Sequence, residues 1–418
     1  STILQELARK RLCNNFALAE MHLSVEFELK GSKQIVFDRT WYQQVIWIRV
    51  YQSTTATEGS LAMLFLSEAE KKEWQTLAAA ISTKSLQPER MKNEVLANFW
   101  AAFCFYVGIL LINQGECARG KEWLAEGMAN EEDGLFCSAF MVAFLERQKN
   151  RLLMPSVAFS DPRPFVHFAT VPEIHASREQ FIRHCGSSVP RFTKPLKIMD
   201  IGCGSGTLLA AFLNRLREIG KAKEVGEILL IDPSPAMIAL ARDTLQRSFP
   251  TSVIKTVTAR IEDLTTSIDS NYDIALSSLA YHHMPAEAKI THLGRLARFI
   301  DHFLLFELDA NHDTPELHSP ELALSVYQVY GRAIDLVFAH DAPLDVAYLC
   351  VDAFLMCEMV SLLTQPRGVR TEYHMLRRQW HDLIQQALGA RFVCLSDSTC
   401  YAYMYLELFA MHFGKSGL

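Results

Sequence analysis

Residues 197–206 have the sequence KIMDIGCGSG. Mostly apolar residues lead up to Asp200, and Gly202, Gly204 and Gly206 then occupy every second position. Glycine tolerates positive φ and lets the backbone approach a ligand closely, so a strand that ends in this way predicts a nucleotide-like binding turn. A dinucleotide-binding turn places its third glycine three residues after the second. Here the interval is two residues, which argues against NAD.

The segment around this turn alternates between strand and helix patterns. We expect strands at 196–201, 227–231, 252–258, 272–277 and 302–308, with helices at 206–220, 234–247 and 286–299. Such alternation predicts a parallel sheet with helices on both faces. Ligands of these sheets bind beyond the carboxyl ends of the strands.

Size and composition limit the remaining possibilities. The 418 residues are too many for one ordinary core, and half of them are apolar. The net charge of −6, without a basic run, argues against a nucleic-acid partner. The ten cysteines form no C-x-x-C pair, and no signal peptide is apparent, so we expect a reducing, cytoplasmic location. We find no apolar run of about 18–20 residues and expect no membrane span; the nearest, 99–112, reads as a buried helix.

Three regions are predicted along the chain. Residues 1–153 form a mostly helical N-terminal domain for acceptor binding or dimerisation, with a helix at 1–22 and two short strands within 23–37. Its segment 103–133 fits a helical hairpin of a bundle, or a single copy of a tetratricopeptide-like repeat. Residues 154–194 form a connector and a leading helix. Residues 195–418 form the ligand-binding domain, with a helical insertion at 314–370, a helix at 377–388 and final strands at 391–396 and 402–412.

The stretch from Asp200 to Gly206 resembles the first motif of class I S-adenosylmethionine (SAM) methyltransferases. Asp232 ends the second strand, 26 residues after Gly206, where an acidic residue of that family binds the ribose hydroxyls; capping of the next helix is the alternative. The resemblance implies an α/β fold with a seven-stranded Rossmann-like sheet, and SAM as cofactor. It implies these cofactor-binding residues: Asp200, Gly202, Cys203, Gly204, Gly206, Asp232, Pro233, Met237, Ile261, Glu262 and Ser277.

Two of these assignments concern the loop at 259–264, which holds the adenine in the family. Arg260 stands where an acidic residue is usual, so the contact falls to Ile261 or to Glu262.

The strand at 272–277 leads into His282 and His283. Paired histidines at this point recur in small-molecule methyltransferases, and a histidine near neutral pKa can accept a proton from a nucleophile. The alternative is that one of them packs or caps the next helix. The Asn/Asp-Pro-Pro-Tyr type of motif, which marks methylation of adenine or of glutamine amides, is absent at 278–281.

A polar cluster follows the fifth strand: Glu307, Asp309, Asn311, His312 and Asp313. Carboxylates and histidine suit divalent cations, but the spacing matches no metal motif, and we predict no metal. Asp309 and His312 are candidates for a base or a substrate-orienting group. Aromatic residues of the insertion line an acceptor pocket or simply form core, and Arg370, Tyr373 and His374 contact substrate or lie on the surface.

These observations predict a SAM-dependent methyltransferase that releases S-adenosylhomocysteine. We expect a small apolar or aromatic acceptor, with O-methylation favoured over N- or C-methylation. Two alternatives stay open: a protein methyltransferase that docks its substrate on the helical domain, and a SAM-binding protein that does not methylate. A homodimer through the N-terminal helices is a further alternative.

Overall fold

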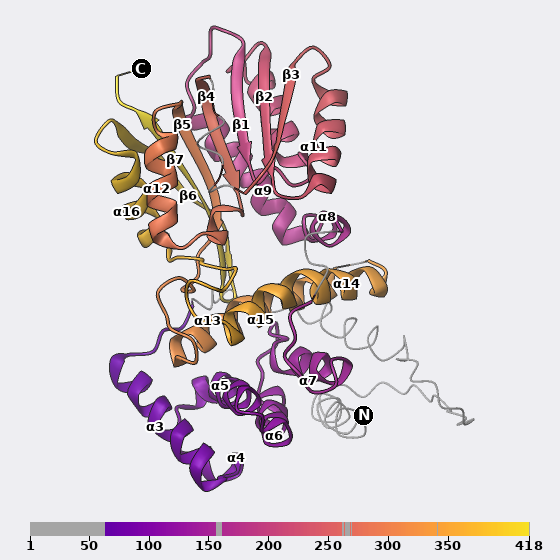
Figure 1. Cartoon of the computed structure of the whole chain (residues 1–418), viewed down its shortest axis with the longest axis vertical. Helices are drawn as coiled ribbons and strands as arrows, with labels where there is room; N and C mark the ends of the chain where they lie inside the picture. Colours follow the sequence, from indigo (N-terminus) through magenta and orange to yellow (C-terminus); the bar gives the residue numbers. More distant parts are fainter. Residues whose placement is uncertain are drawn as a thin grey trace, which may run out of the picture. The chain divides into compact units, whose positions relative to one another are not determined.

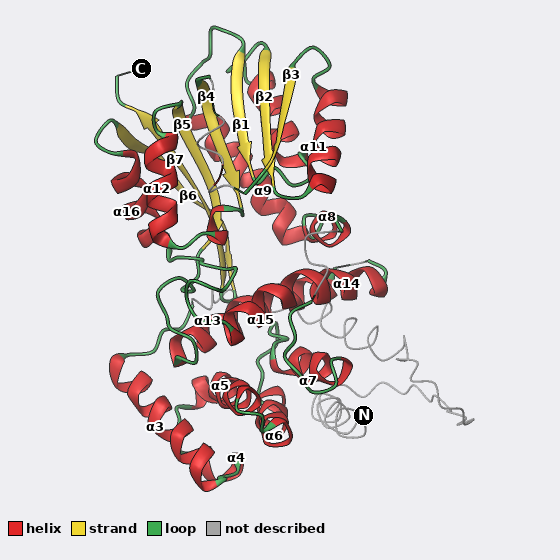
Figure 2. Cartoon of the chain, in the orientation of Figure 1, coloured by secondary structure: helices red, strands yellow, loops and turns green. Residues whose placement is uncertain are grey.

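A computed structural model describes residues 63–155, 161–260, 263, 268, 270–340 and 342–417. The predicted helix at 1–22 and the strands within 23–37 lie outside the described residues. The described part contains one seven-stranded sheet in the order β3-β2-β1-β4-β5-β7-β6 (Figures 1 and 2). The strands are β1 (Leu196–Ile201), β2 (Val225–Asp232), β3 (Val253–Thr258), β4 (Tyr272–Ser278), β5 (Ile300–Leu308), β6 (Phe392–Tyr403) and β7 (Leu406–Lys415).

The sheet confirms the predicted fold class. The strands β1 to β5 pair in parallel, while β7 runs antiparallel to both β5 and β6. The first of the two final strands is longer than predicted and the second begins later, because they form one continuous hairpin whose turn lies at Met404–Tyr405. The carboxyl ends of β1, β2, β4 and β5 therefore share one edge of the sheet.

Helices cover both faces of this sheet. The first group packs together and consists of α9 (Pro172–Ser188), α10 (Thr207–Glu218) and α11 (Pro235–Ser248). The second pair is α12 (Ala286–Leu296) and α16 (Arg377–Leu388). Phe181 of α9 contacts Phe306 of β5, whereas the neighbouring Leu305 belongs to the core under α12 and α16. Successive side chains of a strand point to opposite faces, so the two groups of helices lie on opposite faces.

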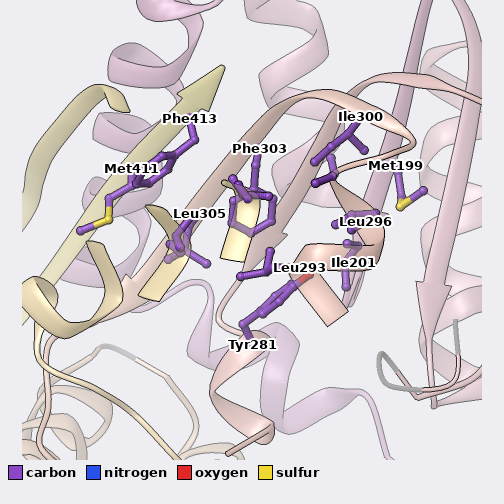
Figure 3. Close-up of a cluster of buried hydrophobic side chains, with 14 of the residues drawn as sticks. Met199, Ile201, Tyr281, Leu293, Leu296, Ile300, Phe303, Leu305, Met411 and Phe413 are labelled. Carbon is purple, nitrogen blue, oxygen red and sulfur yellow. The ribbon is translucent and has the colours of Figure 1, made fainter. Parts of the chain in front are cut away.

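A hydrophobic core lies between the sheet and the pair α12 and α16. Figure 3 shows part of this cluster, in which Phe303 and Leu305 of β5 lie among side chains of neighbouring elements. Leu293 and Leu296 enter from α12, and all four of these side chains are fully buried. Their burial fixes the register of β5 and so the position of the residues at its carboxyl end.

Two further groups of helices complete the described chain. Before the sheet come α3 (Glu68–Lys84), α4 (Pro88–Met91), η1 (Ala97–Phe99), α5 (Trp100–Asn113), α6 (Cys117–Ala129), α7 (Ser138–Arg147) and α8 (Arg163–Phe168). Within the predicted insertion lie α13 (Pro320–Ala339), α14 (Leu344–Cys350), the π-helical turn η4 (Val351–Leu355) and α15 (Met356–Thr364). A short 3₁₀ turn, η3 (Tyr281–His283), follows β4.

The insertion helix α13 is buried along almost its whole length. It contacts α3, α5 and α7 as well as strand β7. Tyr327 packs on Phe105 at 5.6 Å between ring centroids, and Phe338 packs on Phe136 at 5.7 Å. These aromatic residues of the insertion are therefore core, which was the simpler of the two predicted roles.

Residues Leu344–Thr364 form the one helical segment, within the described residues, that has the length and hydropathy of a membrane span. Asp345, Asp352 and Glu358 interrupt this segment, so it is not an uninterrupted apolar run of the kind that the sequence prediction excluded. In the structure, 72% of its apolar window is buried inside the protein, as in the core helix of a folded domain.

The core under α12 predicts a specific sensitivity. Replacing Phe303 with Ala removes a fully buried ring and should lower the free energy of unfolding by about 3–5 kcal/mol, measured by urea denaturation. The exposed Val253 on β3 is the matched strand control, and Val253→Ala should cost less than about 1 kcal/mol. Equal effects of the two substitutions would contradict the placement of the core.

Candidate functional site

The turn after β1 is shaped by its three glycines. Gly202, Gly204 and Gly206 have φ values of 71°, 50° and 73°. A Cβ at Gly202 would lie 2.3 Å from the Cβ of Ala280, and one at Gly206 would lie 2.9 Å from the Cα of Ala241. A Cβ at Gly204 would meet nothing within 4 Å. Packing therefore explains the outer two glycines, while the middle one leaves open space beside a half-buried backbone.

Asp232 connects this turn to the next helix. Its Oδ2 accepts a hydrogen bond from the Gly204 N–H at 3.1 Å, and its Oδ1 accepts one from the Ser234 N–H at 2.9 Å. The N-cap of α11 is Ser234, whose Oγ accepts from the Met237 N–H at 3.4 Å. The alternative prediction that Asp232 itself caps α11 is thus corrected. A carboxylate has about four acceptor positions, so Asp232 keeps capacity for a ligand.

The remaining predicted cofactor residues that the structure describes lie at the same edge of the sheet, but they differ in burial. Asp200, Cys203, Met237 and Ser277 are buried around the turn, whereas Pro233 is exposed. The Ser277 Oγ is buried at the end of β4 and has no hydrogen-bond partner among the described residues. Ile261 and Glu262 lie outside the described residues.

Two carboxylates make this edge electronegative. Burial, reinforced by the charge of Asp232, raises the pKa of Asp200 to about 7, and Arg178 of α9 opposes this rise. Burial also raises the pKa of Asp232, against the effect of its two backbone hydrogen bonds. The unliganded turn is therefore suited to a ligand that carries positive charge.

A second group of polar residues lies beside the turn, beyond the ends of β4 and β5. Its members are His282, His283, Glu307, Glu358, Glu372 and His374. The Nδ1 of His282 lies 2.9 Å from Glu307 Oε2, and its Nε2 lies 3.4 Å from Glu372 Oε2. The His374 ring stacks on His282, with centroids 4.0 Å apart. We call these six residues the His/Glu cluster.

The His/Glu cluster is buried, except for one edge. The His283 side chain is 34% exposed and lies 3.2 Å from Glu372 Oε1 through its Nδ1, whereas Glu307 and Glu372 are fully buried. Triplets of these residues present ligand atoms within 4.8 Å of one another, so the cluster could hold a metal ion.

The histidines of the cluster differ electrostatically. Burial holds the pKa of His282 and of His374 well below the usual value. Burial also acts to lower the pKa of His283, but Glu372 outweighs it and raises that pKa to about 10. Burial raises the pKa of Glu307 to about 7, against the charges of Lys289 and His283.

The other two predicted catalytic residues lie in different surroundings. The Asp309 Oδ1 accepts a hydrogen bond from the Arg377 N–H at 2.9 Å, so this carboxylate sits at the start of α16. His312 is fully buried between Tyr330 and His374, at ring distances of 5.7 and 5.3 Å. The structure brings His282, His283 and His312 together and places Asp309 in a capping contact.

Sequence reasoning missed Glu358 and Glu372 and left His374 undecided. Glu358 lies within the apolar helix α15, where it accepts a hydrogen bond from the Tyr330 hydroxyl at 2.9 Å. An acidic residue inside an apolar helical run was the available signal. Glu372 and His374 precede α16, in a segment that is joined to the turn η3 by the hydrogen bond from Tyr373 N–H to His282 O at 2.6 Å.

Residues 198–302 match a family model described as a methyltransferase domain. Among solved structures, the chain is similar to magnesium protoporphyrin IX methyltransferase (ChlM) from Synechocystis PCC 6803 with bound SAM. The identity is 12%, over 60% of this chain and 91% of that chain, with a TM-score of 0.35. The chain is also similar to SCL7 of Oryza sativa, at 15% identity over 70% of this chain and 93% of that chain, with a TM-score of 0.48.

No curated protein was found to match the chain. The family match falls on the strands that carry the glycine turn, Asp232 and Ser277. The glycine turn, with its open backbone and its electronegative edge, fits the cofactor of that domain. This part of the chain is a class I, Rossmann-like SAM-dependent methyltransferase domain.

Proposed function

We propose that the protein transfers the methyl group of SAM to an oxygen atom of a small, apolar or aromatic metabolite. The observation that carries this proposal is the cover over the carboxyl edge of the sheet. Tyr330 of α13 and Glu358 of α15 reach the His/Glu cluster, which also contains His282 of η3 and Glu307 of β5. A small molecule can be enclosed under such a cover more readily than a segment of a folded protein.

The cofactor would lie along the glycine turn. The backbone amides of this turn would bind the carboxylate of the methionine portion of SAM. Asp232 would accept hydrogen bonds from the ribose hydroxyls. The buried Asp200 would face the cationic methionine portion. The same seat would be lined by Cys203, Met237 and Ser277. The predicted contact of the adenine with Ile261 or Glu262 stays a prediction.

When bound, SAM supplies an electrophilic methyl carbon. The chain's own residues must then align the acceptor and exclude water, which are the main sources of catalysis in a direct displacement. His283 is the partly exposed polar side chain of the cluster and would hold the acceptor oxygen. His282 is enclosed by Glu307 and Glu372, so it would act by supporting this arrangement rather than by touching substrate.

This assignment is tested with radiolabelled SAM and two acceptor pools, a set of small hydroxylated aromatic compounds and an acid-precipitable protein extract. We expect label to enter the small-molecule fraction. His283→Ala should lower turnover about 100-fold or more and change SAM affinity less than about threefold, because it acts on the acceptor. The exposed His175→Ala on α9 is the control and should keep full turnover.

Label that enters only the protein fraction would instead establish the docking alternative. Binding of SAM without transfer to either pool, across a broad set of acceptors, would favour the alternative of a protein that does not methylate.

The ribose role of Asp232 gives a separate prediction. Asp232→Asn keeps the shape of the side chain but removes its charge, and it should weaken SAM binding about 10–100-fold, the range of charged hydrogen bonds. Isothermal titration calorimetry measures this loss. The exposed Asp243→Asn on α11 is the matched control and should bind as the unaltered protein does.

The buried Asp200 predicts a pH dependence of SAM binding. The groups that face it are Asp232, Arg178 and Cys203. Because its pKa without ligand is about 7, the carboxyl is mostly neutral at pH 6 and mostly charged at pH 8. A cationic ligand binds the charged form better, so affinity should rise about tenfold between these pH values.

Asp200→Asn removes the titrating group, so its SAM affinity should change much less over the same range. An equally steep profile in Asp200→Asn would assign the dependence to the ligand or to another group.

A further inference from the structure

The arrangement around Glu372 is unusual for a purely hydrogen-bonded cluster. Glu372 is fully buried, and within the described residues neither of its carboxylate oxygens has a hydrogen-bond partner. Its Oε1 lies 3.2 Å from His283 Nδ1, and its Oε2 lies 3.4 Å from His282 Nε2 and 3.9 Å from His374 Nε2. Burying a carboxylate is costly unless it is paired or binds a cation.

The orientation of His282 makes the contact with Glu372 informative. Its Nδ1 lies 2.9 Å from Glu307 Oε2, which assigns the ring proton to Nδ1 as donor to this carboxylate. The Nε2 then carries a lone pair, which faces the lone pairs of Glu372 Oε2. Two acceptors can face each other favourably in a buried site only if a proton or a metal ion lies between them.

The distances distinguish a metal ion from a shared proton. A charge-assisted hydrogen bond between these groups would be about 2.7–2.9 Å long. Two donors at about 2.0–2.1 Å from a tetrahedral Zn²⁺ lie about 3.3 Å from each other. The observed 3.4 Å between His282 Nε2 and Glu372 Oε2 is close to the second value.

Glu358 completes the set of donors. Its carboxylate, that of Glu372 and a ring nitrogen of His374 lie within 4.8 Å of one another. One Glu358 oxygen already accepts the Tyr330 hydroxyl proton, which fixes the orientation of this carboxylate. Glu307 holds His282 by the same kind of outer hydrogen bond that orients histidine ligands in metal sites.

We propose that His282, His374, Glu358 and Glu372 bind a divalent transition-metal ion. Mixed imidazole and carboxylate donors suit Zn²⁺, and also Fe²⁺ or Mn²⁺. The four ligands come from η3, α15 and the segment before α16, so the ion joins the helical insertion to the methyltransferase sheet. This proposal departs from the sequence prediction of no metal, which weighed the residues after β5 and did not bring His282, His374, Glu358 and Glu372 together.

This proposal does not depend on the identity of the acceptor. The full-length protein, purified without chelator, should contain about one equivalent of metal by mass spectrometry. Removing the metal with EDTA should lower the thermal midpoint by several degrees, and Zn²⁺ should restore it. Protein reconstituted with Co²⁺ should show the visible absorption of a tetrahedral site.

Variants connect this signal to the cluster. Glu372→Gln and His374→Ala should each weaken Zn²⁺ binding at least tenfold and abolish the thermal response to Zn²⁺. His412→Gln is the matched control, because His412 is also a buried histidine, paired with His302 at 3.0 Å in another part of the sheet. It should lose stability but keep full metal content.

Two results would overturn the proposal. The first is unaltered protein that carries no metal and gains no thermal stability with Zn²⁺, Mn²⁺ or Fe²⁺. The second is a full equivalent of metal retained in both Glu372→Gln and His374→Ala. The measurements on the unaltered protein decide the question even if a variant does not fold.

Discussion

The close contact between Gly202 and Ala280 is the constraint on which both parts of the site depend. Only a residue without a side chain can approach Ala280 in this way, since a Cβ would lie 2.3 Å from its methyl group. The contact joins the turn after β1 to the turn after β4. It therefore sets the distance between the cofactor seat and His282 and His283, which follow Ala280 after one residue, Tyr281.

Buried charge is the second constraint. The cofactor seat and the His/Glu cluster compensate this charge in different ways. At the seat, Asp200 and Asp232 face the place of a cationic ligand, whereas the glutamates of the cluster face histidines; they are Glu307, Glu358 and Glu372. In both places the protein keeps carboxylates out of water, which is favourable only with a compensating positive charge. At the cofactor seat this charge comes with SAM, and at the cluster it comes from His283 and from the metal ion that we propose.

The helical insertion connects the His/Glu cluster to the helices that precede the sheet. The helix α13 is core to the preceding helices and also carries Tyr330, which orients Glu358. Packing of apolar side chains on α13 therefore positions a polar group at the site. A loosened insertion would change the cluster even if every residue of the sheet stayed in place.

The sequence by itself determined the strand-turn-helix at 196–218, the succession of strands and helices that makes a parallel sheet, and the cofactor class. These features depend on contiguous residues, such as Gly202, Gly204 and Gly206, whose backbone requirements are local. It also identified His282 and His283 from their position after β4. The roles of Asp309 and of the aromatic residues of the insertion were less certain, because capping and packing depend on what lies opposite.

Only the tertiary structure decided the His/Glu cluster. Its members are separated by up to about 90 positions in the chain, and no spacing rule connects His282 with Glu358, Glu372 and His374. They meet because parallel strands bring their carboxyl ends to one edge and because α15 and the segment before α16 pack over that edge. Side chains that converge in this way carry no periodic signal in sequence, since their proximity arises from the packing of separate elements.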